Sequence, residues 1–230
     1  MEGRGLQLSI IMPCRNEAAT VGMCVDEAAA VLKRTGLNGE ILVVDNASDD
    51  GSYEAASGHG ARVVREESVG YGNAIRRGIK EACGDVLVIG DCDTTYDFSY
   101  AEQMYRMIAS DGYDMVIGDR FGLPMEKGAM SLSHKIGVRV LSAIGRVRYK
   151  TDVRDFHCGL RAIRKDAADK IKLRTAGMEF ATEMIAGAAL SGLSVGQIPV
   201  TLRTCRISRR SKLRTFRDGM RHLVFMLKKT

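Results

Sequence analysis

Short apolar runs recur along this 230-residue chain, and most of them alternate with segments of helical periodicity. Runs of four to six apolar residues are too short for most helices but long enough for buried strands. Strands are predicted over 7–12, 40–45, 62–65, 85–89, 115–118, 160–163 and 195–202. Helices are predicted over 20–34, 53–57, 72–82, 98–109, 133–144, 178–190 and 215–227. This alternation predicts an α/β fold, with a doubly wound, mostly parallel sheet flanked by helices.

Three residues bear on where the predicted elements begin and end. Pro13 has no N–H group to donate, so we expect it to end the first strand. Thr20 is expected to cap the first helix. Pro199 places the last strand at an edge of the sheet or at a bulge.

Two acidic residues, Asp91 and Asp93, follow the predicted strand 85–89 in the stretch GDCDTTYD. Open α/β sheets bind ligands at the carboxyl ends of their strands. If the chain turns there, both carboxylates can reach one Mg²⁺ or Mn²⁺ ion, which takes further oxygen ligands from phosphates and water. Cys92, between them, has neighbours that suit a hard ion better than a thiolate-bound one. The alternative is an acidic, solvated turn, because D-x-D also occurs by chance.

Polar loops also follow the first two predicted strands, as PCRNEA at 13–18 and DNASDDGS at 45–52. Loops at the carboxyl ends of parallel strands lie side by side on one rim of the sheet. Asp45, Asn16 and Glu17 are therefore candidates to accept hydrogen bonds from a base or a ribose. Their alternative roles are helix capping and turn formation.

The segment before the predicted helix 72–82 contains two glycines of a known nucleotide motif. Gly70 and Gly72 match the first two positions of G-x-G-x-x-G, but Ile75 occupies the third. The dinucleotide fingerprint therefore fails, which disfavours a dehydrogenase. What remains is either a tight backbone that a nucleotide can approach closely or a simple turn into a helix.

Composition and cysteine spacing exclude other classes of protein. No apolar run approaches the ~20 residues that span a bilayer. Arg15 and Glu17 end the N-terminal apolar run, so a signal peptide is not expected. The six cysteines form no C-x-x-C pair, which indicates reduced thiols in a cytosolic protein.

Positive charge is concentrated at the C-terminus. Residues 203–230 contain ten Lys or Arg and one acid, Asp218, whereas residues 1–202 carry a net charge of −3. The predicted helix 215–227 is basic and amphipathic, so it can lie on an anionic membrane surface. Alternatively, its apolar face packs on the rest of the protein or its cations are simply solvated. Nucleic-acid binding is disfavoured, because no aromatic residues interleave with the cations.

Eight motifs occur in the order typical of family 2 glycosyltransferases. They are PCRNEAATV, VVDNASDDGS, REESVGYGNAIRRG, GDCDTTYD, IGDR, DFHCGLR, MEFATEM and RRSKLRTFRDGMRHL. The chain most resembles the polyprenyl-phosphate (dolichol-phosphate-type) mannosyl- and glucosyltransferases, from about Leu8 to Leu227. This resemblance implies a GT-A fold, a GDP- or UDP-linked sugar donor and a Mg²⁺ or Mn²⁺ cofactor.

The same resemblance implies roles for individual residues. The residues matching donor-binding positions are Pro13, Arg15, Glu17, Asp45, Gly70, Asp91, Cys92 and Asp93. Among them, Asp91 and Asp93 match the pair that binds the metal and the diphosphate. The candidate catalytic residues are Asp155, Arg120 and Glu183, and Arg120 matches a phosphate-contacting arginine. Gly159 and Arg161 share with Asp155 a segment beside the reacting sugar, and Ser211 and Lys212 match a pair near the acceptor phosphate.

The chain departs from the family pattern at four positions. Asn46 stands where a second aspartate is usual, Thr95 where glutamine is usual, Asp97 where proline is usual and Leu160 where phenylalanine is usual. Asn46 bears on the contact with the base. Thr95 bears on a third protein ligand for the metal.

The chemistry of the acceptor decides which side chains are needed. A phosphate monoester is largely dianionic at neutral pH and needs cations rather than a base. The candidate cations are Arg139, Arg206, Arg209, Arg210, Lys212 and Arg214, and acceptor contacts are expected from Arg139, Arg161, Ser211 and Lys212. A hydroxyl acceptor would need a base, for which Asp155 and Glu183 are the candidates.

We therefore expect an inverting, metal-dependent glycosyltransferase that moves a hexose from a nucleotide sugar to polyprenyl phosphate. It would work in the cytoplasm, as a peripheral protein at the inner face of the membrane. The alternatives are transfer to a soluble peptide or metabolite and a non-catalytic membrane-docking protein. Residues 1–203 are expected to form the catalytic domain, with a nucleotide-sugar half at about 1–120 and an acceptor half at about 121–203. Residues 204–230 form the basic tail, and an oligomer is compatible with the sequence.

Overall fold

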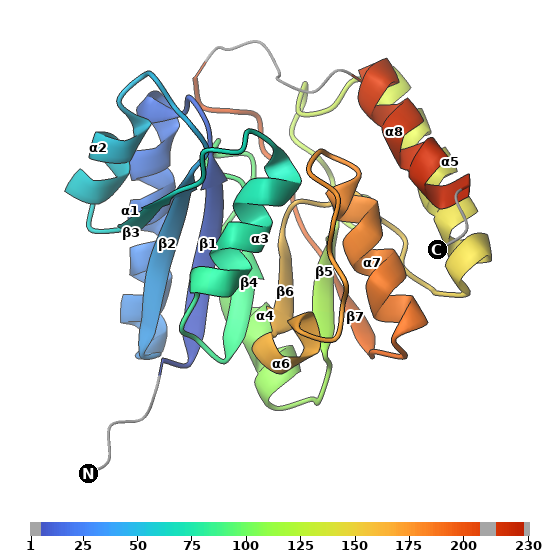
Figure 1. The fold of residues 1–230 in the computed structure, drawn as a ribbon, viewed down its shortest axis with the longest axis horizontal. Coiled ribbons are helices and arrows are strands. Elements are labelled where there is room, and N and C mark those ends of the chain that lie inside the picture. The colour runs from blue at the N-terminus through green and yellow to red at the C-terminus, as the bar shows by residue number, and fades with distance from the viewer. Residues whose placement is uncertain (1–5, 208–214, 228–230) are drawn as a thin grey trace.

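Apolar runs form a central sheet in the computed structural model, which describes residues 6–207 and 215–227 (Figure 1). Seven strands are ordered β3-β2-β1-β4-β6-β5-β7. They are β1 Leu8–Cys14, β2 Gly39–Asp45, β3 Arg62–Arg65, β4 Val86–Ile89, β5 Met115–Asp119, β6 Arg161–Arg164 and β7 Val195–Pro199. Strand β6 is antiparallel to β4 and β5, and the remaining pairs are parallel. The predicted mostly parallel α/β sheet is confirmed.

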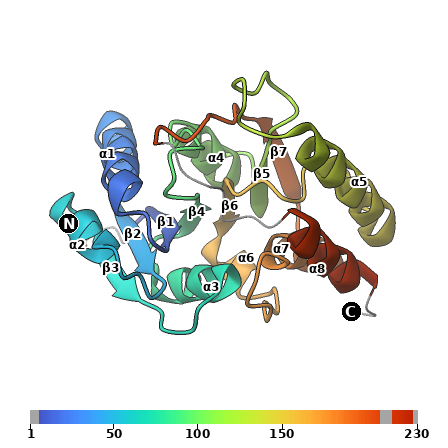
Figure 2. The same ribbon diagram turned by 90° about the horizontal axis from the view of Figure 1, so that it is seen from above.

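Helices cover both faces of the sheet, which is why every residue of β4 and β5 is buried (Figure 2). Helices α1 and α4 lie on one face, and α3 and α7 lie on the other. The helices are α1 Ala18–Thr35, α2 Ser52–Gly58, α3 Tyr71–Glu81, α4 Tyr100–Ala109, α5 Leu132–Tyr149, α6 Lys165–Ala168, α7 Phe180–Leu190 and α8 Thr215–Leu227. Helix α6 was not predicted, and α5 extends beyond its predicted end.

Pro13 does not end the first strand, contrary to prediction. Strand β1 continues to Cys14, with Pro13 in register with Val44 of β2. The pairing of β1 with β4 finishes at Ile11, where Gly90 N donates to Ile11 O. The Pro13 carbonyl lies on that same side of β1 and accepts from Cys92 Sγ. The proline therefore lacks its N–H on the side of β1 where β4 has already ended, so no hydrogen bond between strands is lost.

Thr20 does not cap the first helix either. Helix α1 begins at Ala18, and its cap position is Glu17. Thr20 lies in the first turn, where its Oγ1 donates to the carbonyl oxygen of Cys92 over 2.8 Å. The hydroxyl therefore ties α1 to the aspartate loop, which is a contact 72 residues away in sequence.

Helix α8 has its predicted bounds and two different apolar faces. His222 and Met226 are buried where α8 packs on α5 and α7. Met220, Val224 and Leu227 are 44%, 45% and 71% exposed. The helix thus packs on the body and still presents an apolar stripe. Within residues 6–207 and 215–227, no helix combines the length and apolar character needed to cross a bilayer.

Candidate active site

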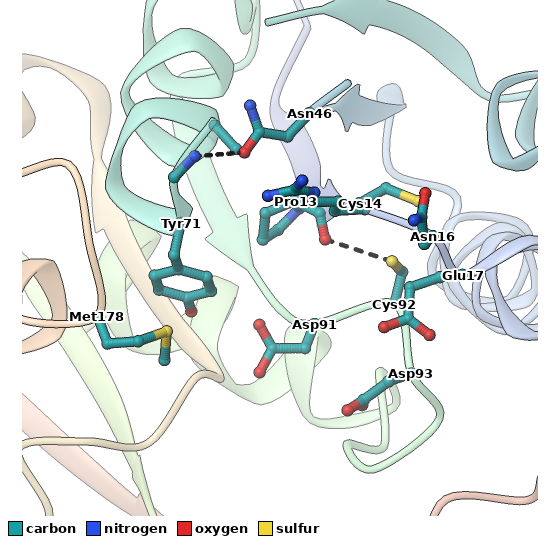
Figure 3. A pocket seen from close by; sticks show the side chains of 13 residues that line it. Pro13, Cys14, Asn16, Glu17, Asn46, Tyr71, Asp91, Cys92, Asp93 and Met178 are labelled. Carbon is teal, nitrogen blue, oxygen red and sulfur yellow. Dashed lines mark hydrogen bonds between the residues drawn. The ribbon is translucent and has the colours of Figure 1, made fainter. Parts of the chain in front are cut away.

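The loops that follow β1, β2 and β4 meet on one rim of the sheet, as predicted. Together with the start of α3 they line a cavity of about 550 Å³, which we call the larger cavity (Figure 3). The lining includes the segment 13–17, Asn46, Gly70, Tyr71, Met178 and the segment 91–93. Of the predicted donor-binding residues, all but Asp45 line this space.

A second cavity of about 350 Å³ adjoins the first, and we call it the smaller cavity. Asp91 and Asp93 line both spaces, so the two carboxylates stand in the wall between them. Arg120, His134 and Thr204 are among the other residues of the smaller cavity. Residues separated by more than 100 positions thus converge at the aspartate pair.

The Asp91 carboxylate is confined by its surroundings. The Tyr71 hydroxyl points toward it from α3 (Figure 3). Burial, followed by the negative charge of Asp93, raises the pKa of Asp91 to about 7. Two neighbouring carboxylates that resist ionising together are a fitting site for a divalent cation, which would neutralise both.

Asp93 is oriented by a residue that departs from the family pattern. Thr95 donates to Asp93 Oδ1 from its N–H over 3.0 Å and from its hydroxyl over 2.5 Å. Thr95 also lines the smaller cavity. Among the described residues, no cluster of three or more His, Cys, Asp or Glu could hold a metal. A cation here would take two ligands from the aspartates and the rest from the donor and water.

Asn46 has a role that an aspartate could not fill. Its Nδ2 donates to the carbonyl oxygens of Glu66 and Ser68 over 2.8 and 3.0 Å, and its Oδ1 accepts from Gly70 N over 2.7 Å. A carboxylate has no N–H to donate, so the amide is required to anchor this loop. The amide thus links β2 to the glycine segment.

Asp45 lies just outside the larger cavity and is 4% exposed. Its Oδ1 is buried and has no hydrogen-bond partner within residues 6–207 and 215–227. Buried polar atoms normally have a partner. The predicted nucleotide contact of Asp45 stays a prediction.

Arg120 and Asp155 form a buried ion pair beside the smaller cavity. Arg120 Nε donates to Asp155 Oδ2 over 2.6 Å, and Nη2 donates to Oδ1 over 2.8 Å. Asp155 is fully buried and also accepts from His157 N over 3.1 Å. Its oxygens are engaged in holding Arg120, and the role as a base, which was predicted only for a hydroxyl acceptor, stays a prediction.

Glu183 and Arg161 also lie away from both cavities. Glu183 accepts from Arg174 N and from the N–H and hydroxyl of Thr175 over 2.9, 2.9 and 2.6 Å. Arg161 is buried and donates to the carbonyl oxygens of Cys158 and Ala181. These contacts hold the protein together, so they give no support to the predicted catalytic role of Glu183 or the predicted acceptor contact of Arg161.

Of the remaining predicted acceptor residues, the structure describes only Arg139. Arg139 lies on the exposed side of α5, with its guanidinium 4.7 Å from the centre of the Phe121 ring. Ser211 and Lys212 lie outside the described residues. Sequence reasoning missed Tyr71 and Tyr96, although both lie within motifs that it quoted. The Tyr96 hydroxyl accepts from Gly159 N, 63 residues away, and the Tyr71 hydroxyl faces Asp91 from another element, which no local pattern reveals.

A buried histidine, His222, and a half-buried one, His157, share one hydroxyl. Thr182 Oγ1 lies 2.8 Å from His222 Nδ1 and 3.2 Å from His157 Nε2, and the two rings are 4.3 Å apart. Burial lowers the pKa of His222 from 6.5 to about 4 and, with the neighbouring imidazole, lowers the pKa of His157 well below 6.5. Both rings are therefore neutral in the folded protein at pH 7.

This pair predicts how stability depends on pH. Between about pH 4 and 6.5 these histidines bind protons in the unfolded chain but stay neutral in the folded chain. The free energy of unfolding therefore falls as the pH falls. Each histidine contributes up to about 1.4 kcal/mol per pH unit. Urea unfolding between about pH 5 and 7 should show a shallower slope for His222→Gln than for the parent protein. Equal slopes would contradict this account, and His59→Gln, at an exposed histidine, serves as the control.

Comparisons with known proteins agree with this geometry. Residues 9–172 match the family described as glycosyl transferase family 2. The low-salt glycan biosynthesis hexosyltransferase Agl6 of Haloferax volcanii is 34% identical over 221 residues, which are 96% of this chain and 53% of that protein. A dolichyl-phosphate hexose transferase of the same organism is 29% identical over 198 residues, covering 85% of this chain and 82% of that protein. The chain therefore spans about half the length of the first relative and most of the second.

A solved structure shares the fold. The glucosyl-3-phosphoglycerate synthase from Mycobacterium tuberculosis, in complex with Mn²⁺, uridine diphosphate and glucosyl-3-phosphoglycerate, superposes with a TM-score of 0.76 at 20% identity. The match covers 96% of this chain and 78% of that one. This likeness confirms the predicted fold class. With the match over residues 9–172, it leads to the conclusion that the chain belongs to glycosyl transferase family 2.

Proposed function

We propose that this protein is an inverting, metal-dependent hexosyltransferase that moves a hexose from a nucleotide sugar to polyprenyl phosphate. The observation that carries the proposal is the position of Asp91 and Asp93 in the wall shared by two cavities. A donor in one cavity and an acceptor in the other would meet at these carboxylates. The dolichyl-phosphate hexose transferase among the relatives supports the acceptor class.

The larger cavity suits the nucleotide sugar. The glycine segment brings main chain to its wall, and the loop residues 13–17 and Asn46 surround it. Asp91 and Asp93 would hold a Mg²⁺ or Mn²⁺ ion together with the donor diphosphate. When bound, the cation stabilises the negative charge that grows on the departing diphosphate.

The smaller cavity suits a phosphate acceptor. Arg120 lines it and is held in place by two hydrogen bonds to Asp155, so its charge is preorganised to face an anion. A phosphate dianion needs no base to become nucleophilic. This agrees with the engagement of Asp155 and Glu183 in structural contacts. Attack from this side, opposite the leaving diphosphate, would invert the anomeric carbon.

Exposed apolar side chains on α5 and α8 suit membrane docking. Helices α5 and α8 lie side by side (Figures 1 and 2). Exposed apolar side chains on α5 are Leu132, Ile136, Val140 and Val147, which are 74%, 56%, 52% and 83% exposed. Their spacing places them on one face of the helix. Exposed cations on the two helices include Arg139, Arg146, Arg217 and Arg221, which favour an anionic lipid surface.

Incubation with candidate donors and acceptors tests the function. The protein is mixed with UDP-glucose or GDP-mannose and Mn²⁺, with polyprenyl phosphate, a soluble phosphorylated acceptor or neither. We expect transfer only with the lipid phosphate, and loss of transfer with a chelator. Transfer to the soluble acceptor alone would replace the proposed acceptor. Absence of donor binding and of turnover would favour the non-catalytic alternative.

Liposome flotation tests the docking surface. The double variant Ile136→Glu and Val140→Glu should reduce flotation with anionic vesicles several-fold. Inserting the apolar face would then bury two carboxylates in lipid, which is unfavourable. Leu190→Glu is the matched control, since Leu190 is 62% exposed at the end of α7, away from this surface. Unchanged flotation of the α5 variant would exclude this surface as the docking site.

A further inference from the structure

We propose that Tyr71 is a positioning residue whose hydroxyl, opposed by Gly159, holds the Asp91 carboxylate in its cation-binding orientation. The inference rests on the proposed metal-dependent function and extends it to two residues outside the aspartate motif. It depends on contacts that come from three separate parts of the chain.

The first observation is that the Tyr71 hydroxyl faces the Asp91 carboxylate inside the larger cavity, which both residues line. Tyr71 is the first residue of α3, and its ring crosses the larger cavity toward the carboxylate (Figure 3). A hydroxyl that donates to one carboxylate lone pair leaves the others directed toward a cation. Such partners of metal ligands fix the orientation of the ligand.

The second part of the arrangement is a clamp that fixes Tyr71 itself. Gly70 and Gly72 flank the tyrosine, and Gly72 N donates to Ala176 O over 2.9 Å. A side chain at Gly70 would collide with the Ala176 carbonyl, and one at Gly72 would collide with the Thr175 carbonyl. Gly70 has φ +154°, a backbone conformation that also favours glycine.

The clamp is anchored by Glu183. Its carboxylate accepts hydrogen bonds from Arg174 and Thr175, which hold the loop 174–176 against the glycines. The path from Glu183 through this loop to Tyr71 consists of direct contacts. Glu183 therefore supports the orientation of Tyr71 even though it lies in neither cavity.

The third part closes the other side of Asp91. A methyl group at Gly159 would lie 2.5 Å from Asp91 Oδ2, so glycine is the only residue that leaves the carboxylate in place. Gly159 is held there because its N–H donates to the Tyr96 hydroxyl over 2.8 Å. Asp91 is thus confined between a tyrosine hydroxyl and a glycine.

Tyr71→Phe tests the positioning role by metal binding rather than by turnover. The dissociation constant for Mn²⁺ is measured by electron paramagnetic resonance in the presence of UDP, and UDP binding is measured separately with a chelator. Loss of a partner to a metal ligand typically costs about 10–100-fold in affinity, and we expect that loss for Mn²⁺. UDP binding without metal and the melting temperature should stay at parental values.

The matched control is Tyr105→Phe. The Tyr105 hydroxyl contacts Gln7, which directly precedes β1 and so lies at the opposite end of the strand from the cavities. Mn²⁺ binding by Tyr71→Phe within twofold of the parent would overturn the positioning role and leave the proposed function intact. Failure of the parent protein to bind Mn²⁺ would overturn both.

Gly159→Ala provides a second, independent test. The added methyl group should displace Asp91 and weaken Mn²⁺ binding by at least tenfold. Gly58→Ala is the control, since a methyl group at Gly58 would meet no atom within 4 Å. Parental Mn²⁺ affinity in a folded Gly159→Ala protein would overturn the inference. If that variant does not fold, the outcome for Tyr71→Phe decides.

Discussion

Asp91→Asn and Asp93→Asn are each expected to lower kcat by about 10²–10³, which is the usual loss when one preorganised electrostatic contact to a transition state is removed. Each amide keeps the shape of the carboxylate but contributes no negative charge to a cation. Among the residues that the structure describes, the two aspartates alone are common to both cavity walls, so both substrates would depend on them.

The measurement is initial-rate hexosyl transfer with saturating donor, acceptor and Mn²⁺. Asp111→Asn is the matched control, because Asp111 is exposed in the turn after α4. Its rate should equal that of the parent protein. A rate within tenfold of the parent for both active-site variants would contradict the proposed role of the aspartates.

Asp155→Asn is expected to lower the free energy of unfolding by about 3–5 kcal/mol, because it leaves a buried guanidinium without its counter-charge. Arg120 is 5% exposed and Asp155 is fully buried, so water cannot replace the lost partner. Transfer activity should also fall, since Arg120 would no longer be held toward the smaller cavity. Urea unfolding measures the first effect and initial rates measure the second.

Two further variants separate stability from function. Arg34→Gln removes one partner of an exposed pair, Arg34 and Glu102, and should cost less than about 1 kcal/mol. Arg120→Met combined with Asp155→Leu removes both buried charges and should recover much of the stability without recovering transfer. A loss below about 1 kcal/mol for Asp155→Asn would show that the ion pair is not the buried support that its geometry indicates.

Local pattern was enough to predict most of the fold. The strands come from short apolar runs, and a strand's side-chain period and length are set within a few residues. Pro199 predicted the edge position of β7, because a proline has no N–H to donate to a second neighbouring strand. Pro13 gave the opposite result, because the effect of a proline depends on whether the neighbouring strand extends that far. Strand β4 stops short of it, which no pattern near residue 13 reveals.

The candidate site divides in the same way. Asp91 and Asp93 were found because they are two residues apart and directly follow a strand. The hydrogen bonds of Asn46, Glu183 and Asp155 could not be predicted, because their partners are main-chain groups or a buried arginine brought close only by folding. The asparagine that replaces the usual aspartate looked like a lost ligand, yet its amide ties β2 to the glycine segment.

The sequence by itself determined the order of strands and helices, the aspartate pair and the family, because these depend on residue type and on spacing along the chain. Only the tertiary structure decided that two cavities share the aspartates, that Tyr71 and Gly159 confine Asp91, and which acids face a cavity. Those properties depend on burial and on contacts between segments far apart in sequence, and such contacts exist only once the sheet has brought its carboxyl ends together.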